Sequence, residues 1–204
     1  MDFALRVWRE NAYSLRGWQR CPVYEPPSGQ VSYDAAMRIA DSLIAEIERE
    51  SKSTERILDR VPKDKIDWRP HQKSMTIGEL AWHIANMPAM AVKGLQEGKR
   101  EVSGARPSPR EGEDFAGTFR RNVENLKATL GSTADEVLLT ERFAFVRDGE
   151  TVTSFPKLGF IRTVFINHSI HHRGQLTVYL RLLDIPVPAM YGTSADENAF
   201  ERKA

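Results

Sequence analysis

Apolar residues recur at steps of three and four positions in four separate segments of this chain. Such spacing places the apolar side chains on one face of an α-helix, so it predicts four amphipathic helices. The segments span about residues 33–58, 76–95, 113–130 and 156–183. Helices of this kind stabilise a fold by packing their apolar faces together, and the chain lacks the alternating strand and helix units of a doubly wound sheet. The sequence therefore predicts an all-α fold, a four-helix bundle.

Local signals indicate where the second and third helices begin and end. Thr76 followed three residues later by Glu79 is the pattern of a capping box. Pro88 lies inside the second helix and predicts a kink there. Gly131 is a natural stop for the third helix, and residues 98–112 are predicted to be a loop.

The stretch 137–155 differs in character from the helices around it. Phe143, Phe145 and Val146 precede an Asp148-Gly149 pair, and Thr151 to Thr153 follow it. Apolar and β-branched residues on both sides of such a pair predict a short β-hairpin with a tight turn.

The two ends of the chain are predicted to lie outside the helical domain. Residues 1–32 contain Trp8 and Trp18 and then several prolines, so we expect an N-terminal extension that packs on the main body or on a partner chain. The helical domain is predicted over residues 33–197, and residues 198–204 form a C-terminal tail.

The composition excludes several classes of protein. The 204 residues carry 29 basic and 28 acidic side chains, a net charge of +1, which gives no electrostatic reason to expect nucleic acid as a partner. One cysteine, Cys21, cannot form an intramolecular disulfide or a cysteine-based zinc finger. We expect it to be inert, with a redox role as the alternative. No apolar run is long enough to cross a membrane, and charges interrupt the N-terminus where a secretory signal would be apolar. We therefore expect a cytoplasmic protein.

Two histidines on the fourth predicted helix point to chemistry. His168 and His172 are four residues apart, so they lie one turn apart on one face, within the arc of the apolar side chains. Imidazoles at this spacing can chelate one divalent ion. Ser169 stands where the zinc-protease motif His-Glu-x-x-His has its glutamate, which disfavours that class of hydrolase. The alternative is that both are core histidines satisfied by hydrogen bonds.

A third histidine strengthens the metal hypothesis. His83 lies in the middle of the second helix on the same face as Leu80 and Met87. Three inward histidines from two helices would form a His₃ set with positions open for water or substrate, as in catalytic metal sites. We expect His71 to be a surface residue, whereas His171 is a candidate to support the ligands or a polar residue at a helix seam.

Together with the histidines, three blocks of sequence resemble the DinB-like (DinB/YfiT) metalloenzyme family. They span residues 67–85, 168–175, which read His-x-x-x-His-Arg-Gly-Gln from His168, and 186–197. The resemblance implies an up-down-down-up four-helix bundle, usually a homodimer. It also implies a divalent metal, zinc or nickel, held by His83, His168 and His172. Some relatives use low-molecular-weight thiols, among them bacillithiol S-transferases and mycothiol-dependent maleylpyruvate isomerase.

Three hypotheses about function follow. The first is a metal-dependent enzyme of the thiol S-transferase type, acting on a small electrophilic substrate. The second is a non-catalytic metal or small-ligand binding protein of a stress response, and the third is a structural bundle with three buried neutral histidines.

Four polar side chains near the histidines have roles that the sequence leaves open. Glu79, one turn before His83, either supports a ligand or only caps its helix. Gln175 is placed near the mouth of the site, and Arg173 is expected in an ion pair or an interface. Tyr179 is expected to pack rather than to act in catalysis.

Overall fold

The computed structural model describes residues 37–102, 108–109, 112–198 and 200. The described residues form one compact unit. The extension predicted over residues 1–32, which includes Cys21, lies outside the described residues, as does most of the tail. The boundaries of the predicted domain therefore stay predictions.

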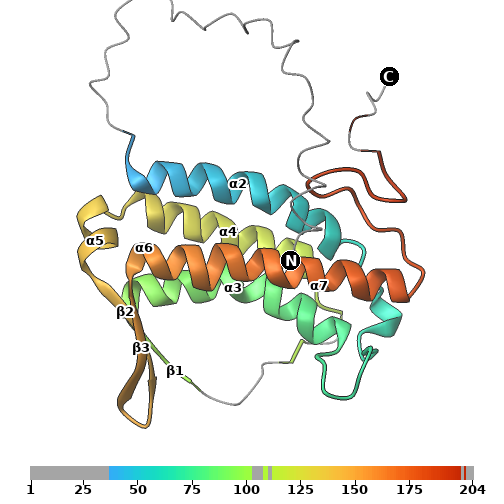
Figure 1. Ribbon diagram of the computed structural model, residues 1–204, viewed down its shortest axis with the longest axis horizontal. Helices are drawn as coiled ribbons and strands as arrows, with labels where there is room; N and C mark the ends of the chain where they lie inside the picture. The colour runs from blue at the N-terminus through green and yellow to red at the C-terminus, as the bar shows by residue number, and fades with distance from the viewer. Residues whose placement is uncertain (1–36, 103–107, 110–111, 199, 201–204) are drawn as a thin grey trace, which may run out of the picture. The chain divides into compact units, whose positions relative to one another are not determined.

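Four long helical segments lie side by side and make up most of the described chain (Figure 1). The first three are single α-helices, and the fourth is a composite of three consecutive helical stretches. They are α2 (Ile39–Leu58), α3 (Ile77–Glu97), α4 (Phe115–Gly131), and α6 (Lys157–Phe160) followed by η2 (Ile161–Asn167) and α7 (His168–Leu182). A single-turn 3₁₀ helix, η1 (Lys63–Lys65), lies in the link between α2 and α3. All four helices expected from the apolar spacing are present.

The first helix begins later than the apolar spacing predicts. Arg38 is extended, with ψ of 145°, and α2 starts at Ile39. The backbone N–H groups of Ile39 and Ala40 donate to the carboxylate of Asp135, at 2.9 and 3.3 Å. An acidic side chain from a distant segment therefore caps this helix, a contact that local sequence cannot indicate.

The second helix has the cap that its sequence predicts. The Thr76 hydroxyl accepts from the backbone N–H of Glu79 at 3.0 Å, and the Glu79 carboxylate accepts from the backbone N–H of Thr76 at 2.8 Å. Helix α3 then runs through Pro88 to Glu97 and ends at Gly98, whose φ of 67° is left-handed. Glycine adopts that conformation without steric cost.

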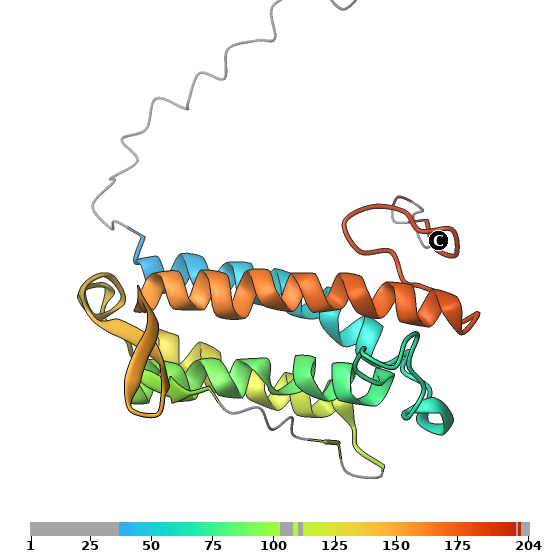
Figure 2. The same ribbon diagram turned by 60° about the horizontal axis from the view of Figure 1, so that its bottom comes forward.

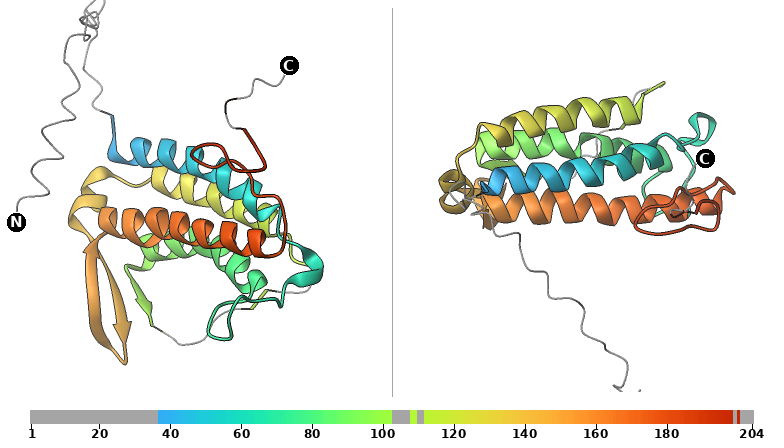
Figure 3. Two further views of the ribbon diagram at one scale, coloured as in Figure 1. Left: turned by 45° about the vertical axis from the view of Figure 1, so that its right-hand side comes forward. Right: turned by 90° about the horizontal axis from the view of Figure 1, so that it is seen from above.

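The apolar faces of the long helices meet in one core. Helix α3 packs against α4 and α7, and α2 packs against the same two helices (Figure 2). Two further views show the same arrangement from the side and from above (Figure 3). Fully buried leucine and isoleucine side chains from all four segments fill the space between them, including Leu43, Ile84, Leu126, Leu176 and Leu180.

A small sheet lies at one end of the helices. The predicted hairpin is confirmed as β2 (Arg142–Arg147) and β3 (Glu150–Pro156), which pair antiparallel. Asp148 and Gly149, with φ of 52° and 83°, form the turn. Left-handed backbone at both positions suits the twist of a two-residue hairpin turn.

Two elements near this hairpin correct the sequence prediction. Residues 98–112 were expected to be loop throughout, but β1 (Lys99–Glu101) pairs in parallel with β2, with Lys99 opposite Ala144. A three-residue strand exposed on both faces has no periodic apolar signal, so only its partner reveals it. A short helix, α5 (Asp135–Thr140), also precedes β2.

The fourth helix contains a wider turn that the sequence does not predict. Residues Ile161–Asn167 form a π-helix between α6 and α7. In such a segment each carbonyl pairs with the N–H five residues later instead of four, and these segments occur often at functional sites. Here the π-helix ends directly before His168. No helix in the described chain combines the length and apolar character needed to cross a membrane.

Candidate metal centre

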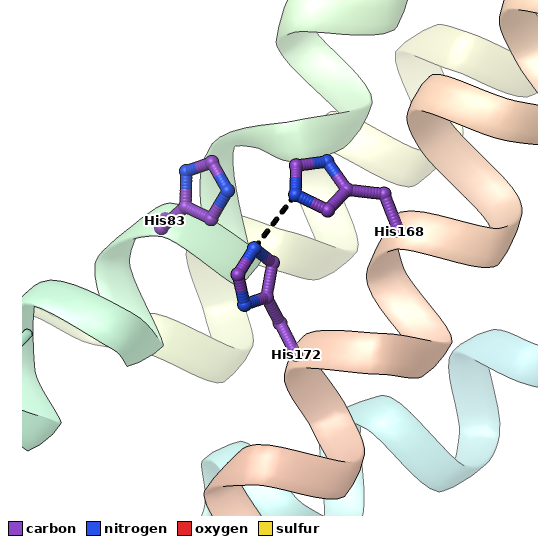
Figure 4. A group of neighbouring side chains, drawn as sticks. All are labelled: His83, His168 and His172. Atoms are coloured by element: carbon purple, nitrogen blue, oxygen red, sulfur yellow. Dashed lines mark hydrogen bonds between the residues drawn. The ribbon is translucent and has the colours of Figure 1, made fainter. Parts of the chain in front are cut away.

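Three histidine side chains converge between α3 and α7 (Figure 4). Each offers a ring nitrogen, and these nitrogens all lie within 4.8 Å of one another. The ring centroids of His168 and His172 are 4.4 Å apart, and the His83 ring lies 5.3 Å from the first and 4.7 Å from the second. The structure thus brings together the three residues that the sequence selects.

Helix geometry explains how the cluster forms. His83 lies in the first half of α3, between the buried side chains of Leu80 and Met87, so the core contacts of the helix direct its ring toward α7. His168 begins α7 and His172 follows one turn later on the same face. His172 is buried at 7% exposure, whereas the rings of His83 and His168 are half-buried.

Oxygen acceptors fix the orientation of the His168 and His172 rings. His168 Nδ1 lies 3.3 Å from the backbone carbonyl of Val164, and His172 Nδ1 lies 2.6 Å from Oε1 of Gln175. A carbonyl oxygen only accepts, so each Nδ1 carries the ring proton and each Nε2 keeps its lone pair. Metal-binding histidines use the same arrangement, in which the second ring nitrogen donates to an oxygen.

The two Nε2 atoms approach each other closely. They are 2.7 Å apart, as the dashed line in Figure 4 shows. With both ring protons on Nδ1, two lone pairs meet at this distance and repel. A shared metal cation removes that repulsion, whereas a proton between the rings would make one of them a cationic imidazolium, which burial disfavours. The donor pattern therefore fits a metal ion better than a buried histidine pair.

Burial keeps these imidazoles neutral. Desolvation lowers the pKa of His172 to about 4, with smaller contributions from His168 and His171. Burial likewise lowers the pKa of His168, against an opposing effect of its hydrogen bond to Val164. A neutral imidazole is the form that binds a metal, so these two candidate ligands need not lose a proton near neutral pH.

The spacing of the nitrogens also fits one ion. Two imidazole nitrogens bound to one zinc at about 2.0–2.1 Å in a tetrahedron lie roughly 3.3 Å apart. The observed range, from 2.7 Å between the Nε2 atoms to the 4.8 Å limit, requires only small ring movements. No aspartate or glutamate oxygen of the described chain joins the group.

The other histidines and Glu79 lie around this centre in different ways. His171 is exposed, and its ring centroid is 5.0 Å from that of His172. His71 is exposed in the loop before α3, as predicted. The Glu79 carboxylate takes part in the capping box. Roles for His171 and Glu79 in supporting the ligands stay predictions.

Gln175, predicted near the mouth of the site, makes a specific contact with His172. Gln175 lies three residues after His172, so both side chains share one helix face. This i, i+3 spacing was the available signal. Tyr179 packs edge-to-face on Trp68, at 5.8 Å between centroids, as its predicted packing role requires.

Arg173 forms an ion pair with Glu50, as predicted. The residue is 2% exposed, and its guanidinium donates to the carboxylate of Glu50 on α2 at 2.6 Å, to the backbone carbonyl of Glu50 at 2.9 Å and to Thr54 Oγ1 at 3.1 Å. It also hydrogen-bonds to the hydroxyl of Tyr191. This network joins α7 to α2 on the side of the helix away from His172.

A cavity of about 870 Å³ adjoins the histidines. His83 and His168 line one part of it, and residues of α3, β1, β2 and the start of the fourth helix line the rest. Pockets for small ligands are typically of this size and mostly apolar. None of the sequence patterns indicates the cavity, because its walls come from four separate segments.

Comparison with known proteins identifies the class to which this fold and site belong. The model of the DinB family matches residues 35–204. The chain therefore belongs to the DinB family. Among curated proteins, the uncharacterized protein YrdA of Bacillus subtilis (strain 168) is 23% identical over 157 residues, which cover 77% of this chain and 90% of YrdA.

Solved structures of two DinB-like proteins share the fold. One, from Bacillus cereus ATCC 10987, matches with a TM-score of 0.59 and 24% identity over 74% of this chain and 97% of its own. The other, YjoA from Bacillus subtilis, matches with a TM-score of 0.53 and 22% identity over 72% of this chain and 96% of its own.

Proposed function

We propose that this protein binds one divalent metal ion, zinc or nickel, through His83, His168 and His172. The main support is the donor pattern: two Nδ1 atoms face oxygen acceptors while the two Nε2 atoms meet at 2.7 Å. Three protein ligands leave at least one position of the ion for water or substrate, as catalytic sites require.

We further propose that the centre serves a thiol S-transferase acting on a small electrophilic substrate. A divalent ion lowers the pKa of a bound water and deprotonates a bound thiol. In such a transfer the thiol proton passes to solvent, sulfur forms a bond to the electrophilic carbon, and a leaving group departs with its electron pair. The chain's own contribution is to hold the rings in place and to provide the cavity beside them. The sulfur comes from a substrate of low molecular weight in this scheme, not from Cys21.

The second candidate function is a non-catalytic metal or small-ligand binding protein of a stress response. One observation favours it: within the described chain no carboxylate joins the three histidines as a general base. The Glu79 carboxylate, one turn before His83, already accepts from the backbone of Thr76.

Metal content tests the centre directly. Protein purified without a nickel column is dialysed against zinc or nickel and then against buffer, and its bound metal is measured by mass spectrometry. We expect one equivalent in the wild type and in His71→Ala, which removes an exposed histidine, and a loss of most bound metal in His168→Ala. Equal metal in both variants, or none in the wild type, would overturn the proposed centre.

Activity separates the two candidate functions. Glutathione, cysteine, bacillithiol and mycothiol are each incubated with a model electrophile and with loaded protein. The transferase proposal expects conjugation by at least one thiol that His168→Ala abolishes while its circular dichroism is unchanged. Metal binding without conjugation of any thiol favours the binding protein.

The arrangement and assembly of the chain complete the proposal. We propose the up-down-down-up bundle topology for the four long helices, a homodimer in solution, and a cytoplasmic location. Light scattering tests the assembly, because a monomer would give a mass of about 23 kDa.

A further inference from the structure

The inner walls of the cavity beside the histidines are apolar and aromatic. Phe143 and Phe160 stack with their centroids 3.9 Å apart, and Phe145 meets Phe143 edge-on at 5.0 Å. Phe143 and Phe160 are almost fully buried. Gly94 on α3 allows this packing, because a Cβ there would lie 2.3 Å from Phe160 Cζ. Flat aromatic walls favour a flat, apolar ligand.

The rim of the cavity is charged instead. All of its exposed side chains come from the last turns of α3 and from β1, namely Lys93, Glu97, Lys99, Arg100 and Glu101. Glu97 lies 3.7 Å from Lys93, and Glu101 accepts from the backbone N–H of Asp148 at 2.9 Å. Glu97 therefore has an ion-pair partner and Glu101 has a hydrogen-bond donor.

Two basic residues of the rim, Lys99 and Arg100, differ from these acidic residues in their neighbours. In the part of the chain that the structure describes, no carboxylate lies within 4.0 Å of Lys99 or Arg100. Arg100 Nη1 instead lies 2.9 Å from the sulfur of Met90, a half-buried residue of the cavity wall. A guanidinium beside an apolar wall and without a carboxylate partner is suited to a carboxylate or sulfonate of a ligand.

We propose that this cavity binds a flat, mostly apolar organic anion whose negative group pairs with Arg100 while its apolar body lies against the half-buried wall side chains of Trp82, Phe145 and Val164. Because His83 and His168 line the same cavity, such a molecule lies beside the proposed metal centre. The claim that this anion is the substrate of the metal centre rests on the proposed function. Binding of the anion itself needs only the cavity.

A pair of dyes tests this in metal-free protein treated with EDTA. The anionic dye is 8-anilinonaphthalene-1-sulfonate, and the neutral dye is N-phenyl-1-naphthylamine, which has the same rings without the sulfonate. Fluorescence titrations measure the dissociation constant of each dye for the wild type, for Arg100→Gln and for Arg49→Gln. Arg49 is an exposed residue of α2 that does not line the cavity, so its variant makes the same change in net charge elsewhere.

We expect the wild type to bind both dyes saturably. Arg100→Gln should weaken the sulfonate dye by about tenfold or more, because a charge-assisted hydrogen bond is lost, and should change the neutral dye by less than about twofold. Arg49→Gln should leave both constants unchanged. The proposal is overturned if Arg100→Gln affects both dyes equally or neither, or if Arg49→Gln matches its effect.

These outcomes are independent of the metal. If the protein binds no metal but shows the Arg100 effect, the anion site is supported and the proposed metal centre is overturned. If the protein binds metal through the histidines but shows no Arg100 effect, the metal centre is supported and the anion site is overturned.

Discussion

At the scale of single residues, Gln175 contacts the candidate centre directly through one of its three histidines. Its Oε1 lies 2.6 Å from His172 Nδ1 and so directs the lone pair of Nε2 toward the other two rings. Such partners of ligating histidines set the tautomer and the basicity of the ring. His168 has the same support from the backbone of Val164, which no substitution of a side chain removes.

Gln175→Leu removes the acceptor and keeps a similar volume. We expect zinc affinity to fall by about 10- to 100-fold, because His172 loses the contact that fixes its tautomer. Gln175→Glu retains an acceptor and should bind zinc at least as tightly as the wild type. Competition with a chromophoric chelator measures these constants.

Gln96→Leu is the matched control, since Gln96 is exposed on α3 and does not line the cavity. Equal zinc affinity in the Gln175→Leu and Gln96→Leu variants would contradict a role for Gln175 in holding His172.

At the scale of elements, the contact between α3 and the start of the fourth helix depends on Gly94. The Phe160 ring occupies the place where a side chain at position 94 would begin. A Cβ at position 94 would also lie 3.1 Å from Cε2 of Phe143. Glycine is therefore required at this point of α3 by the close approach of another element, although glycine lowers the stability of a helix interior.

Gly94→Ala should lower the free energy of unfolding by about 1–3 kcal/mol, because Phe160 must move within a packed core. Gly174→Ala, in α7, should raise it by up to about 1 kcal/mol, because a Cβ there meets nothing within 4 Å and alanine favours the helix. Urea unfolding followed by circular dichroism measures both. A Gly94→Ala variant as stable as Gly174→Ala would contradict the packing described for Phe160.

The π-helix is the second feature that acts at this scale. It occupies Ile161–Asn167, directly before the first metal-ligand candidate of the fourth helix. The carbonyl of Val164, which orients His168, lies within it. The wider turn and the candidate site are therefore adjacent parts of one helix.

At the scale of the whole molecule, a buried ion pair connects α7 with α2. The side chain of Arg173 is 3% exposed and that of Glu50 is 17% exposed. The hydroxyl of Tyr191, in the C-terminal segment, donates to the same carboxylate at 2.6 Å. The network thereby joins three distant parts of the chain and holds the helix that carries His168 and His172.

Removal of one partner should be costly. Arg173→Met leaves the Glu50 carboxylate largely buried without its guanidinium, so we expect the free energy of unfolding to fall by about 3–5 kcal/mol. The double variant Glu50→Gln, Arg173→Met should recover part of that loss, since no charge is left unpaired. Chemical denaturation of metal-free protein gives both values, and a double variant less stable than Arg173→Met would contradict this explanation.

The same pair makes a specific contribution to acid stability. Burial acts to raise the pKa of Glu50, but hydrogen bonds from Tyr191 and Arg173 and the charges of Arg173 and Arg49 outweigh it, so the pKa lies below its ordinary value of 4.5. Because the folded protein holds this carboxylate ionised more strongly than the unfolded chain does, the pair stabilises the fold above pH 4.5. That stability is lost as the pH falls through the lowered pKa.

We therefore expect the unfolding free energy of metal-free wild type to fall more steeply below about pH 4.5 than that of Glu50→Gln. The measurement is urea unfolding at a series of pH values, with protonation of the buried histidines common to both proteins. Parallel curves for the two proteins would contradict the lowered pKa of Glu50.

The sequence by itself determined the local features of this protein. Apolar spacing located the four long helices, the Thr76 and Glu79 pair located the cap of α3, and the Asp148-Gly149 pair located the hairpin turn. Helical phase also selected the three candidate ligands, because residues four apart share a face and a histidine among core positions points inward.

Tertiary structure alone decided what depends on contacts between distant segments. The cap of α2 by Asp135, the strand β1 and the cavity all arise from neighbours far away in the chain. Local periodicity does not indicate which distant segments will be neighbours. In the same way, His83 comes close to His168 and His172 only because α3 packs against α7.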